Sequence, residues 1–310
     1  MKIYEGLDHF QAVKNAVVTS GTFDGVHLGH QKILARIRNI ADQMEGETVL
    51  ITFWPHPRLV LHPEEHNLRL LTTFEEKAKL LEKAGIDHLI TIPFTKEFSQ
   101  LTGEEFIQKV LIDKIHTKKL VIGYDHRFGK NREGSFDHLK ANIDRYGFEL
   151  EEISREDVDH VGISSTKIRK ALLAGHINEA TEFLGRPYEL NGIVIKGQQI
   201  GRSIDFPTAN IHVPSNYKLI PGDGAYVVEV AVGQETYQAM LNIGNRPTVD
   251  GIEKTVEAHL FDYNDNLYDK QITVYFKDFL RAERKFANLE ELKNQLKRDK
   301  EKARQIFNES

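Results

Sequence analysis

Two histidines, His27 and His30, flank a glycine in a run from Gly21 that reads G-T-F-D-G-V-H-L-G-H. The β-branched segment 16–20 before the run predicts a buried strand, and isoleucines at helical spacing after it predict a helix. Glycines let such a turn approach a ligand closely, and a helix N-terminus presents unpaired N–H groups to anions. The pattern predicts a phosphate site. A metal site would need a third ligand. The structural alternative is that the histidines merely cap the helix. The candidate residues are Gly21, Phe23, Asp24, His27, Gly29 and His30.

A second pattern of the same kind begins at Ser164 and reads S-S-T-K-I-R-K. A serine here is a natural N-cap for a helix that runs to Gly175, and a purely structural cap is the simpler interpretation. However, Thr166 and Arg169 lie one helical turn apart on one face, where a hydroxyl and a guanidinium can hold a phosphate. The candidate residues are Ser164, Ser165, Thr166 and Arg169.

Strand-like and helix-like segments alternate from residue 16 to about residue 150. This alternation predicts an α/β fold with a parallel, doubly wound sheet, in which ligands bind beyond the carboxyl ends of the strands. The predicted strands are 16–20, 48–53, 88–92, 119–123 and 149–153, and the predicted helices are 30–44, 74–84, 103–115 and 136–146.

Two polar segments follow strands of this predicted sheet. One contains Pro55, His56 and Pro57, and the other contains Asp125 and Phe128. Each has a structural alternative, a loop stiffened by proline in the first case and a flexible surface turn in the second. Their shared position at strand ends favours a ligand-binding site. Phe128 and Trp54, which precedes Pro55, would pack there on an aromatic ligand.

The pattern changes at Pro187, after a short helix predicted over 176–186. Consecutive strands without intervening helices predict a small antiparallel barrel, so we expect two domains, 1–185 and 186–310. An amphipathic helix follows the last strand, and its charged remainder is most simply a solvated face. The predicted strands of the barrel are 192–196, 225–232, 239–243, 256–261 and 272–276.

A glycine-containing loop precedes an extended segment in this second domain, and it supplies the candidate phosphate contacts Gly197, Gly201 and Arg202. In the extended segment Thr208 and Asn210 alternate onto one face and offer hard oxygen ligands suited to Mg²⁺. The alternative is a β-hairpin loop without function.

Glu257 lies on a predicted barrel strand between Val256 and Ala258, whose side chains point the other way. The glutamate therefore faces outward or lines a cleft. An exposed glutamate on a strand is usually just solvated.

The two N-terminal motifs resemble the H-x-G-H and S-S-T-x-x-R motifs of nucleotidyltransferases, in the form found in bacterial FAD synthetases. The segments G-R-x-x-x-F-P-T-A-N from Gly201, N-I-G-N-R-P-T from Asn242 and V-E-A-H from Val256 resemble the riboflavin kinase module. Over essentially the whole chain, this order is similar to that of the bacterial bifunctional riboflavin kinase/FMN adenylyltransferases. One departure is Asp205, at a position where the family commonly has glycine, which a positive φ would favour.

The resemblance implies a Rossmann-like adenylyltransferase domain followed by a riboflavin kinase barrel. The barrel would convert riboflavin and ATP to FMN and ADP, with Glu257 as general base, Mg²⁺ on Thr208 and Asn210, and Arg281 near the flavin. The first domain would then convert FMN and a second ATP to FAD and pyrophosphate. There the histidine and serine–threonine–arginine motifs would align phosphates, and the segments 54–57 and 124–129 would hold the flavin.

The composition sets limits on partners and location. The formal charge of −5 gives no electrostatic case for nucleic acid as a partner. The absence of cysteine excludes disulfides, cysteine-ligated metals and thiol catalysis, and it fits a reducing compartment. We expect no signal peptide, no membrane span and a cytoplasmic location, while the oligomeric state stays open.

Two other functions are compatible with parts of the sequence. One is a different adenylyltransferase or cytidylyltransferase that carries the barrel as a binding appendage. The other is a non-enzymatic barrel protein that binds flavin or nucleic acid. The pairing of P-T-A-N with Glu257 argues against the first, and the net charge and paired phosphate sites argue against the second.

Overall fold

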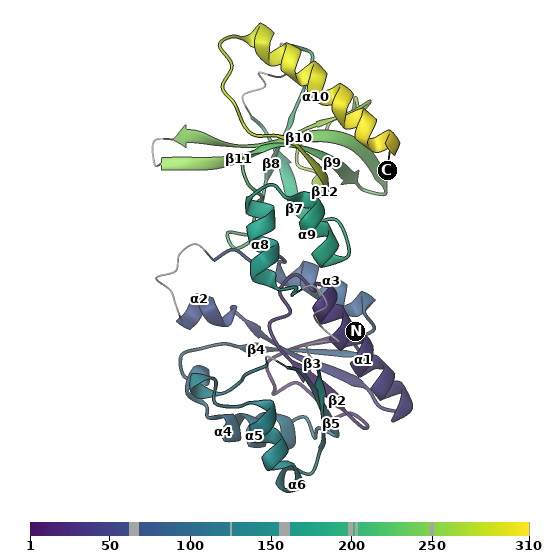
Figure 1. Cartoon of the computed structure of the whole chain (residues 1–310), viewed down its shortest axis with the longest axis vertical. Helices are drawn as coiled ribbons and strands as arrows, with labels where there is room; N and C mark the ends of the chain where they lie inside the picture. Colours follow the sequence, from purple (N-terminus) through teal and green to yellow (C-terminus); the bar gives the residue numbers. More distant parts are fainter. Residues whose placement is uncertain are drawn as a thin grey trace. The chain divides into compact units, whose positions relative to one another are not determined.

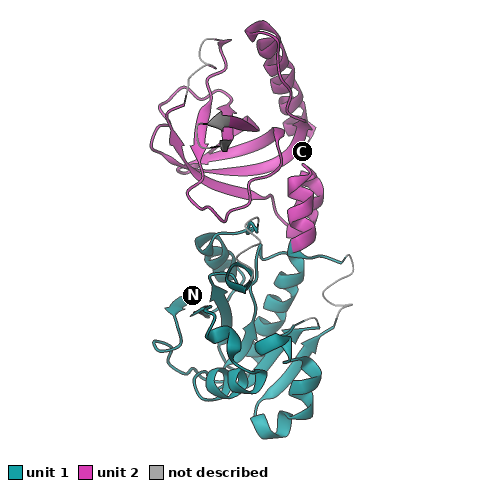
Figure 2. Cartoon of the chain, turned by 90° about the vertical axis from the view of Figure 1, so that its left-hand side faces the viewer, with its two compact units in different colours: residues 1–165 teal, residues 166–310 magenta. Residues whose placement is uncertain are grey.

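The computed structural model in Figure 1 describes residues 1–61, 68–124, 126–154, 162–197, 201, 204–248 and 251–309. The described chain forms two compact units, Met1–Ser165 and Thr166–Ser310 (Figure 2). Among the described residues, every helix is too short or too polar to span a lipid bilayer.

The first unit is built on a parallel sheet with the strand order β1-β4-β3-β2-β5-β6. This confirms the predicted doubly wound sheet. The direction of winding reverses between β2 and β5, and such a reversal opens a ligand crevice beyond the carboxyl ends of the two strands. The strand β1 was not predicted. The strands are β1 (Lys2–Glu5), β2 (Val17–Ser20), β3 (Thr48–Trp54), β4 (His88–Pro93), β5 (Lys119–Gly123) and β6 (Glu149–Ile153).

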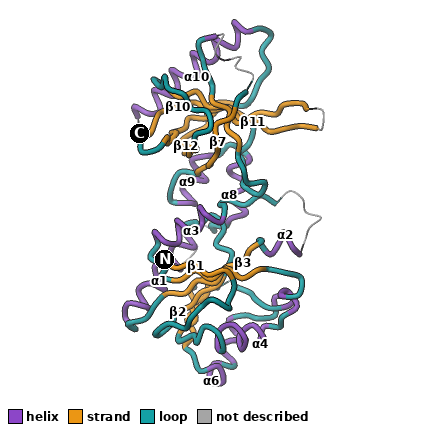
Figure 3. Tube along the Cα trace, turned by 180° about the vertical axis from the view of Figure 1, so that it is seen from behind, coloured by secondary structure: helices purple, strands orange, loops and turns teal. Residues whose placement is uncertain are grey.

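Helices cover both faces of this sheet (Figures 1 and 3). Val17 and Leu50 pack on the face with α1 (Leu28–Gln43) and α3 (Phe74–Lys83), whereas the next residues in each strand, such as Val18, pack on the other face. Because successive strand side chains alternate between faces, both faces need apolar residues, which explains why the strands read as apolar runs.

The predicted helices over 103–115 and 136–146 are each divided in the structure. The first becomes a short α-helix and then a π-helix, and the second is interrupted at Asn142. The segment after β3, predicted only as a loop, contains the helix α2, which begins at a proline. These elements are α2 (Pro57–Leu61), η1 (Phe98–Gln100), α4 (Gly103–Phe106), η2 (Ile107–Ile112), η3 (Lys130–Arg132), α5 (Phe136–Ala141) and α6 (Ile143–Tyr146).

The second unit contains a closed barrel with the strand order β10-β11-β8-β7-β12-β9, paired antiparallel throughout. This confirms the predicted antiparallel barrel and adds β8, which the sequence indicated only as an extended segment. The strands are β7 (Glu189–Ile195), β8 (Ala209–His212), β9 (Gly224–Val232), β10 (Glu235–Thr248), β11 (Gly251–Leu260) and β12 (Gln271–Arg281).

The C-terminal helix α10 (Leu289–Glu309) packs on the outer surface of the barrel. Leu292 and Leu296 of α10 belong to one apolar cluster with Val227 and Met240 of the barrel. Tyr226, the neighbour of Val227, is also fully buried and therefore faces the barrel interior. The barrel thus has two apolar layers, one inside it and one beneath α10.

Two further helices, α8 (Ser165–Leu173) and α9 (Ile177–Leu184), precede the barrel. Gly222 of the second unit donates its backbone N–H to the carbonyl of Leu172 at 3.0 Å, so α8 packs with the barrel. The domain boundary at 185/186, drawn from the change in sequence pattern, stays a prediction.

Candidate active sites

The turn between β2 and α1 holds His27 and His30 side by side. His27 is the N-cap of α1, and its Nδ1 accepts a hydrogen bond from the backbone N–H of His30 at 3.4 Å. The two imidazole rings stack, with ring centroids 3.7 Å apart and 15° between the planes. Helix capping by histidine, the structural alternative, is therefore present together with a paired arrangement of rings at the helix N-terminus.

The environment of His30 keeps its ring neutral. Burial, followed by the positive charges of His27 and Lys77, lowers the pKa of His30 well below its usual value. Its Nδ1 is buried and has no hydrogen-bond partner among the described residues. An anion bound beside the two rings would favour the protonated form of His30, because opposite charge stabilises the imidazolium.

Asp24 anchors this turn from inside the unit. Its buried carboxylate accepts hydrogen bonds from the backbone N–H groups of Leu71 at 2.9 Å and Thr72 at 3.2 Å. Gly25 has a φ of 83°, and a Cβ added there would lie 2.7 Å from the Leu71 side chain. We predicted Asp24 as a phosphate-binding residue, and these contacts show that it fixes the shape of the turn.

The second predicted phosphate motif, which starts at Ser164, contacts the same turn. Ser165, the first residue of α8, donates its hydroxyl hydrogen to the carbonyl of Asp24 at 2.9 Å, across 141 residues of sequence. Thr166 and Arg169 follow within α8 at helical spacing and belong to the second compact unit. The structure therefore brings the start of the S-S-T-K-I-R motif to the H-x-G-H turn.

The two predicted flavin segments are held by different local contacts. Pro57 is the first residue of α2, a position that suits proline because the missing N–H would be unpaired there. His56 Nδ1 accepts a hydrogen bond from the backbone N–H of Arg58 at 3.2 Å. Phe128 is half-buried against Phe106, with ring centroids 5.5 Å apart. The other predicted flavin contact of the second segment, Asp125, lies outside the described residues.

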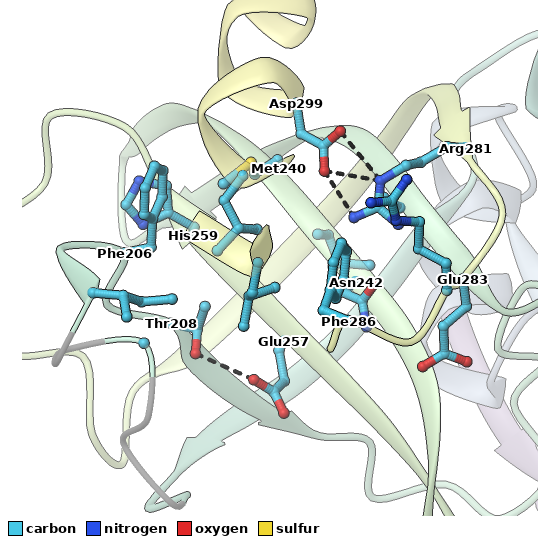
Figure 4. A pocket seen from close by; sticks show the side chains of 17 residues that line it. Phe206, Thr208, Met240, Asn242, Glu257, His259, Arg281, Glu283, Phe286 and Asp299 are labelled. Carbon is cyan, nitrogen blue, oxygen red and sulfur yellow. Dashed lines mark hydrogen bonds and ion pairs between the residues drawn. The ribbon is translucent and has the colours of Figure 1, made fainter. Parts of the chain in front are cut away.

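A polar group in the second unit brings together Thr208, Asn210 and Glu257. The Thr208 hydroxyl donates to the Glu257 carboxylate at 3.2 Å (Figure 4). Asn210 pairs with Glu257 across the β8–β11 ladder. Gly197 is packed so closely that an added Cβ would lie 2.2 Å from Asn210 Nδ2. Arg202 lies outside the described residues.

Thr208 and Glu257 line a pocket of about 310 Å³ between the barrel surface and α10. Glu257 is half-buried there, so it is neither fully solvated nor part of the barrel core. The pocket is lined by Gly201, Ile204, Phe206, Thr208, Ala225, Met240, Leu241, Asn242, Glu257, His259, Arg281, Glu283, Arg284, Phe286, Leu292, Leu296 and Asp299.

Arg281, a predicted flavin contact, lines the pocket, and its side chain is fixed by a carboxylate of the C-terminal helix. Its guanidinium donates to both carboxylate oxygens of Asp299 on α10, at distances from 2.8 to 3.2 Å (Figure 4). The sequence prediction missed Asp299. The available signal was its position seven residues after Leu292 and three after Leu296, which places an acidic side chain within the apolar stripe of the helix.

Asp205 has a φ of 65°, the left-handed conformation that favours glycine, and its carboxylate lies 2.6 Å from Lys293 Nζ on α10. For the riboflavin kinase that the sequence resemblance implies, we expect Asp205→Gly to release this contact between Asp205 and α10. The KM for ATP should rise by a factor of about two to five, because exposed ion pairs are weak. Steady-state kinetics of FMN formation would measure this. Lys293→Met removes the same ion pair without changing the backbone, and an unchanged KM in that variant would contradict a role for the ion pair.

Comparisons with known proteins match both halves of the chain. Residues 9–167 match the FAD synthetase family, and residues 184–307 match the riboflavin kinase family. The bifunctional riboflavin kinase/FMN adenylyltransferase of Haemophilus influenzae is 36% identical over 99% of this chain and 100% of its own length. That of Listeria monocytogenes is 37% identical over 94% of this chain and 93% of its own length.

A similar full-length fold is found among solved structures. A crystal structure from Streptococcus pneumoniae, described as a macrolide-efflux protein, has a TM-score of 0.90 and 31% sequence identity and covers 97% of this chain and 98% of that chain. Because the second half matches an enzyme family of its own, the barrel is not a binding appendage of another nucleotidyltransferase. The chain belongs to the bifunctional riboflavin kinase/FMN adenylyltransferases, which phosphorylate riboflavin to FMN and then adenylylate FMN to FAD.

Proposed function

We propose that the two reactions of this enzyme occur at the two sites described above, FMN adenylylation in residues 1–185 and riboflavin phosphorylation in residues 186–310. The observation that carries the kinase assignment is the hydrogen bond from Thr208 to Glu257 beside the pocket. The hydrogen bond from Ser165 to the H-x-G-H turn supports the adenylyltransferase assignment.

In the kinase site, Glu257 is the general base that takes the proton of the ribityl 5′-hydroxyl. The hydroxyl oxygen then attacks the γ-phosphorus of ATP, and ADP leaves. The pocket volume of about 310 Å³ lies at the lower end of the range for small-molecule sites. Phe206 and Met240 offer apolar surface for the flavin ring, and Asp299 fixes Arg281 at the pocket wall.

The residues beside Glu257 fit a magnesium ion. The Thr208 hydroxyl and the Asn210 amide supply hard oxygen atoms on one face of an extended segment, next to a carboxylate. The described residues contain no cluster of three or more histidine, cysteine or acidic side chains able to hold a metal. An ion here would thus take its other ligands from ATP phosphates and water, and it would neutralise phosphate charge during transfer.

In the adenylyltransferase site, a phosphate oxygen of FMN attacks the α-phosphorus of ATP, and pyrophosphate leaves. The FMN phosphate is already ionised at neutral pH, so the site needs no general base and acts by alignment and charge stabilisation. His27, His30, Ser165, Thr166 and Arg169 perform this task in our proposal, and the segments 54–57 and 124–129 hold the flavin. The cysteine-free sequence is consistent with the cytoplasm, where we place the enzyme.

A single time course tests the whole assignment. The purified chain is incubated with riboflavin, ATP and Mg²⁺, and the flavins are separated by chromatography. We expect FMN first and FAD later, and neither product when Mg²⁺ is removed with a chelator. FMN alone would contradict the adenylyltransferase site, FAD formed only from supplied FMN would contradict the kinase site, and turnover in chelator would contradict the metal.

A further inference from the structure

Lys77 is a buried cation next to the H-x-G-H turn. Its side chain extends from α3, and the residue is 6% exposed. The ammonium group donates hydrogen bonds to the carbonyl of Thr22 at 3.2 Å and to the hydroxyl of Thr52 at 2.9 Å. Both acceptors are neutral, and among the described residues Lys77 has no salt bridge. The carboxylate of Asp24 acts on it only at longer range.

Packing does not explain a lysine at this position. The neighbours Ala78 and Leu81 on α3 are apolar and buried, so a methionine or leucine at position 77 would continue the same face. Burying a cation without a directly bonded carboxylate destabilises the folded state. Burial lowers the pKa of Lys77 to about 8, which leaves the ammonium form dominant at neutral pH. The fold therefore tolerates an unfavourable charge at this place.

The charge of Lys77 acts on the proposed phosphate site. Its positive charge is one of the causes that lower the pKa of His30, together with burial and the charge of His27. In addition, the Thr22 carbonyl that it holds belongs to the turn that leads from β2 to the two histidines. One side chain thus fixes the backbone of the turn and adds a positive charge beside it, where the polyphosphate of ATP would bind.

We propose that Lys77 is a positioning residue of the adenylyltransferase reaction, which fixes the Thr22 carbonyl and supplies a buried positive charge that favours phosphate beside His30. The inference rests on the proposed adenylyltransferase site at His27 and His30. It assigns no role to Lys77 in riboflavin phosphorylation.

The unmodified enzyme provides the first test. Lys77 carries its charge below its pKa of about 8 and loses it above that value. The kcat/KM for FAD formation reports the ionisations of the free enzyme, so it should decline as the pH rises through about 8, where the phosphates of both substrates no longer titrate. A kcat/KM that stays constant from pH 7 to pH 9.5 would overturn the proposal.

Lys77→Met is the second test, with Lys79→Met as its matched control on the exposed face of the same helix. We expect Lys77→Met to lower kcat for FAD formation by about tenfold or more at pH 7, to remove the decline above pH 8, and to leave FMN formation unchanged. Lys79→Met should behave like the unmodified enzyme. Thr52→Val removes one hydrogen bond but keeps the charge, so it should retain the decline above pH 8 even if its rate is lower.

A titration of His30 by NMR gives a readout that does not depend on turnover, with the signal assigned by its loss in His30→Asn. The pKa of His30 should rise in Lys77→Met and stay unchanged in Lys79→Met. If Lys77→Met keeps full FAD formation while His30→Ala loses it, the inference about Lys77 is wrong and the proposed site stands. If neither variant loses FAD formation, the assignment of the site itself is wrong.

Discussion

His30→Ala should abolish FAD formation and leave FMN formation intact. Its ring stacks on His27 at the N-terminus of α1, and its Nδ1 is buried without a partner among the described residues. A donor placed where phosphate charge develops contributes about a hundredfold to a thousandfold to kcat, so a loss of this size is expected. The measurement is the rate of FAD formation from supplied FMN, next to the rate of FMN formation from riboflavin in the same preparation.

His9→Ala is the matched control for this variant, since His9 is exposed in the same compact unit and lies outside the turn. It should leave both rates unchanged. An equal loss of FMN and FAD formation in His30→Ala would contradict two separate sites. Full FAD formation would show that the paired histidines serve only to cap the helix.

Glu257→Gln should block riboflavin phosphorylation while supplied FMN still becomes FAD. Glutamine keeps the size of the side chain and an oxygen that accepts the Thr208 hydrogen bond of 3.2 Å, so the pocket should keep its shape. It cannot take up a proton, and the loss of a general base lowers a rate by about a hundredfold to ten-thousandfold. Separate assays of the two half-reactions measure the effect.

Glu301→Gln makes the same chemical change at an exposed position of α10 and should leave both activities unchanged. If FMN synthesis survives in Glu257→Gln, another group takes the proton of the ribityl hydroxyl. If both activities fall together, the variant has disturbed the whole chain, and the assignment of Glu257 as a base would then lack support.

Local sequence patterns predicted the scaffold well. The strands of the parallel sheet other than β1 were predicted within about one residue, because strands buried on both faces read as continuous apolar runs between helical patterns. Each predicted barrel strand was found as well, since alternating patterns without helices leave few other folds. The turn from β2 to α1 was predicted because glycines, a helix N-terminus and two histidines occur within ten residues.

Contacts between distant residues determined the rest. Phosphate binding by Asp24 stays a prediction. Its carboxylate accepts hydrogen bonds from the backbone N–H groups of Leu71 and Thr72, which no local pattern links to it. No sequence pattern distinguished Lys77 from the other lysines of α3. Only its hydrogen bonds to Thr22 and Thr52 in the tertiary structure do so. The physical reason is that periodicity shows which face of an element is buried, whereas the partner on that face depends on packing.

The kinase pocket illustrates the same division. Thr208, Asn210 and Glu257 were selected because the segments that contain them resemble the riboflavin kinase module. Strand alternation added only that Thr208 and Asn210 share one face and that the side chain of Glu257 points away from the barrel core. The pairing of β8 with β11 that joins them, and the helix α10 that closes the pocket with Asp299, come from the tertiary structure. The residue types thus determine what chemistry these side chains can perform. The side chains come together because the barrel closes and the apolar stripe of α10 is buried against it.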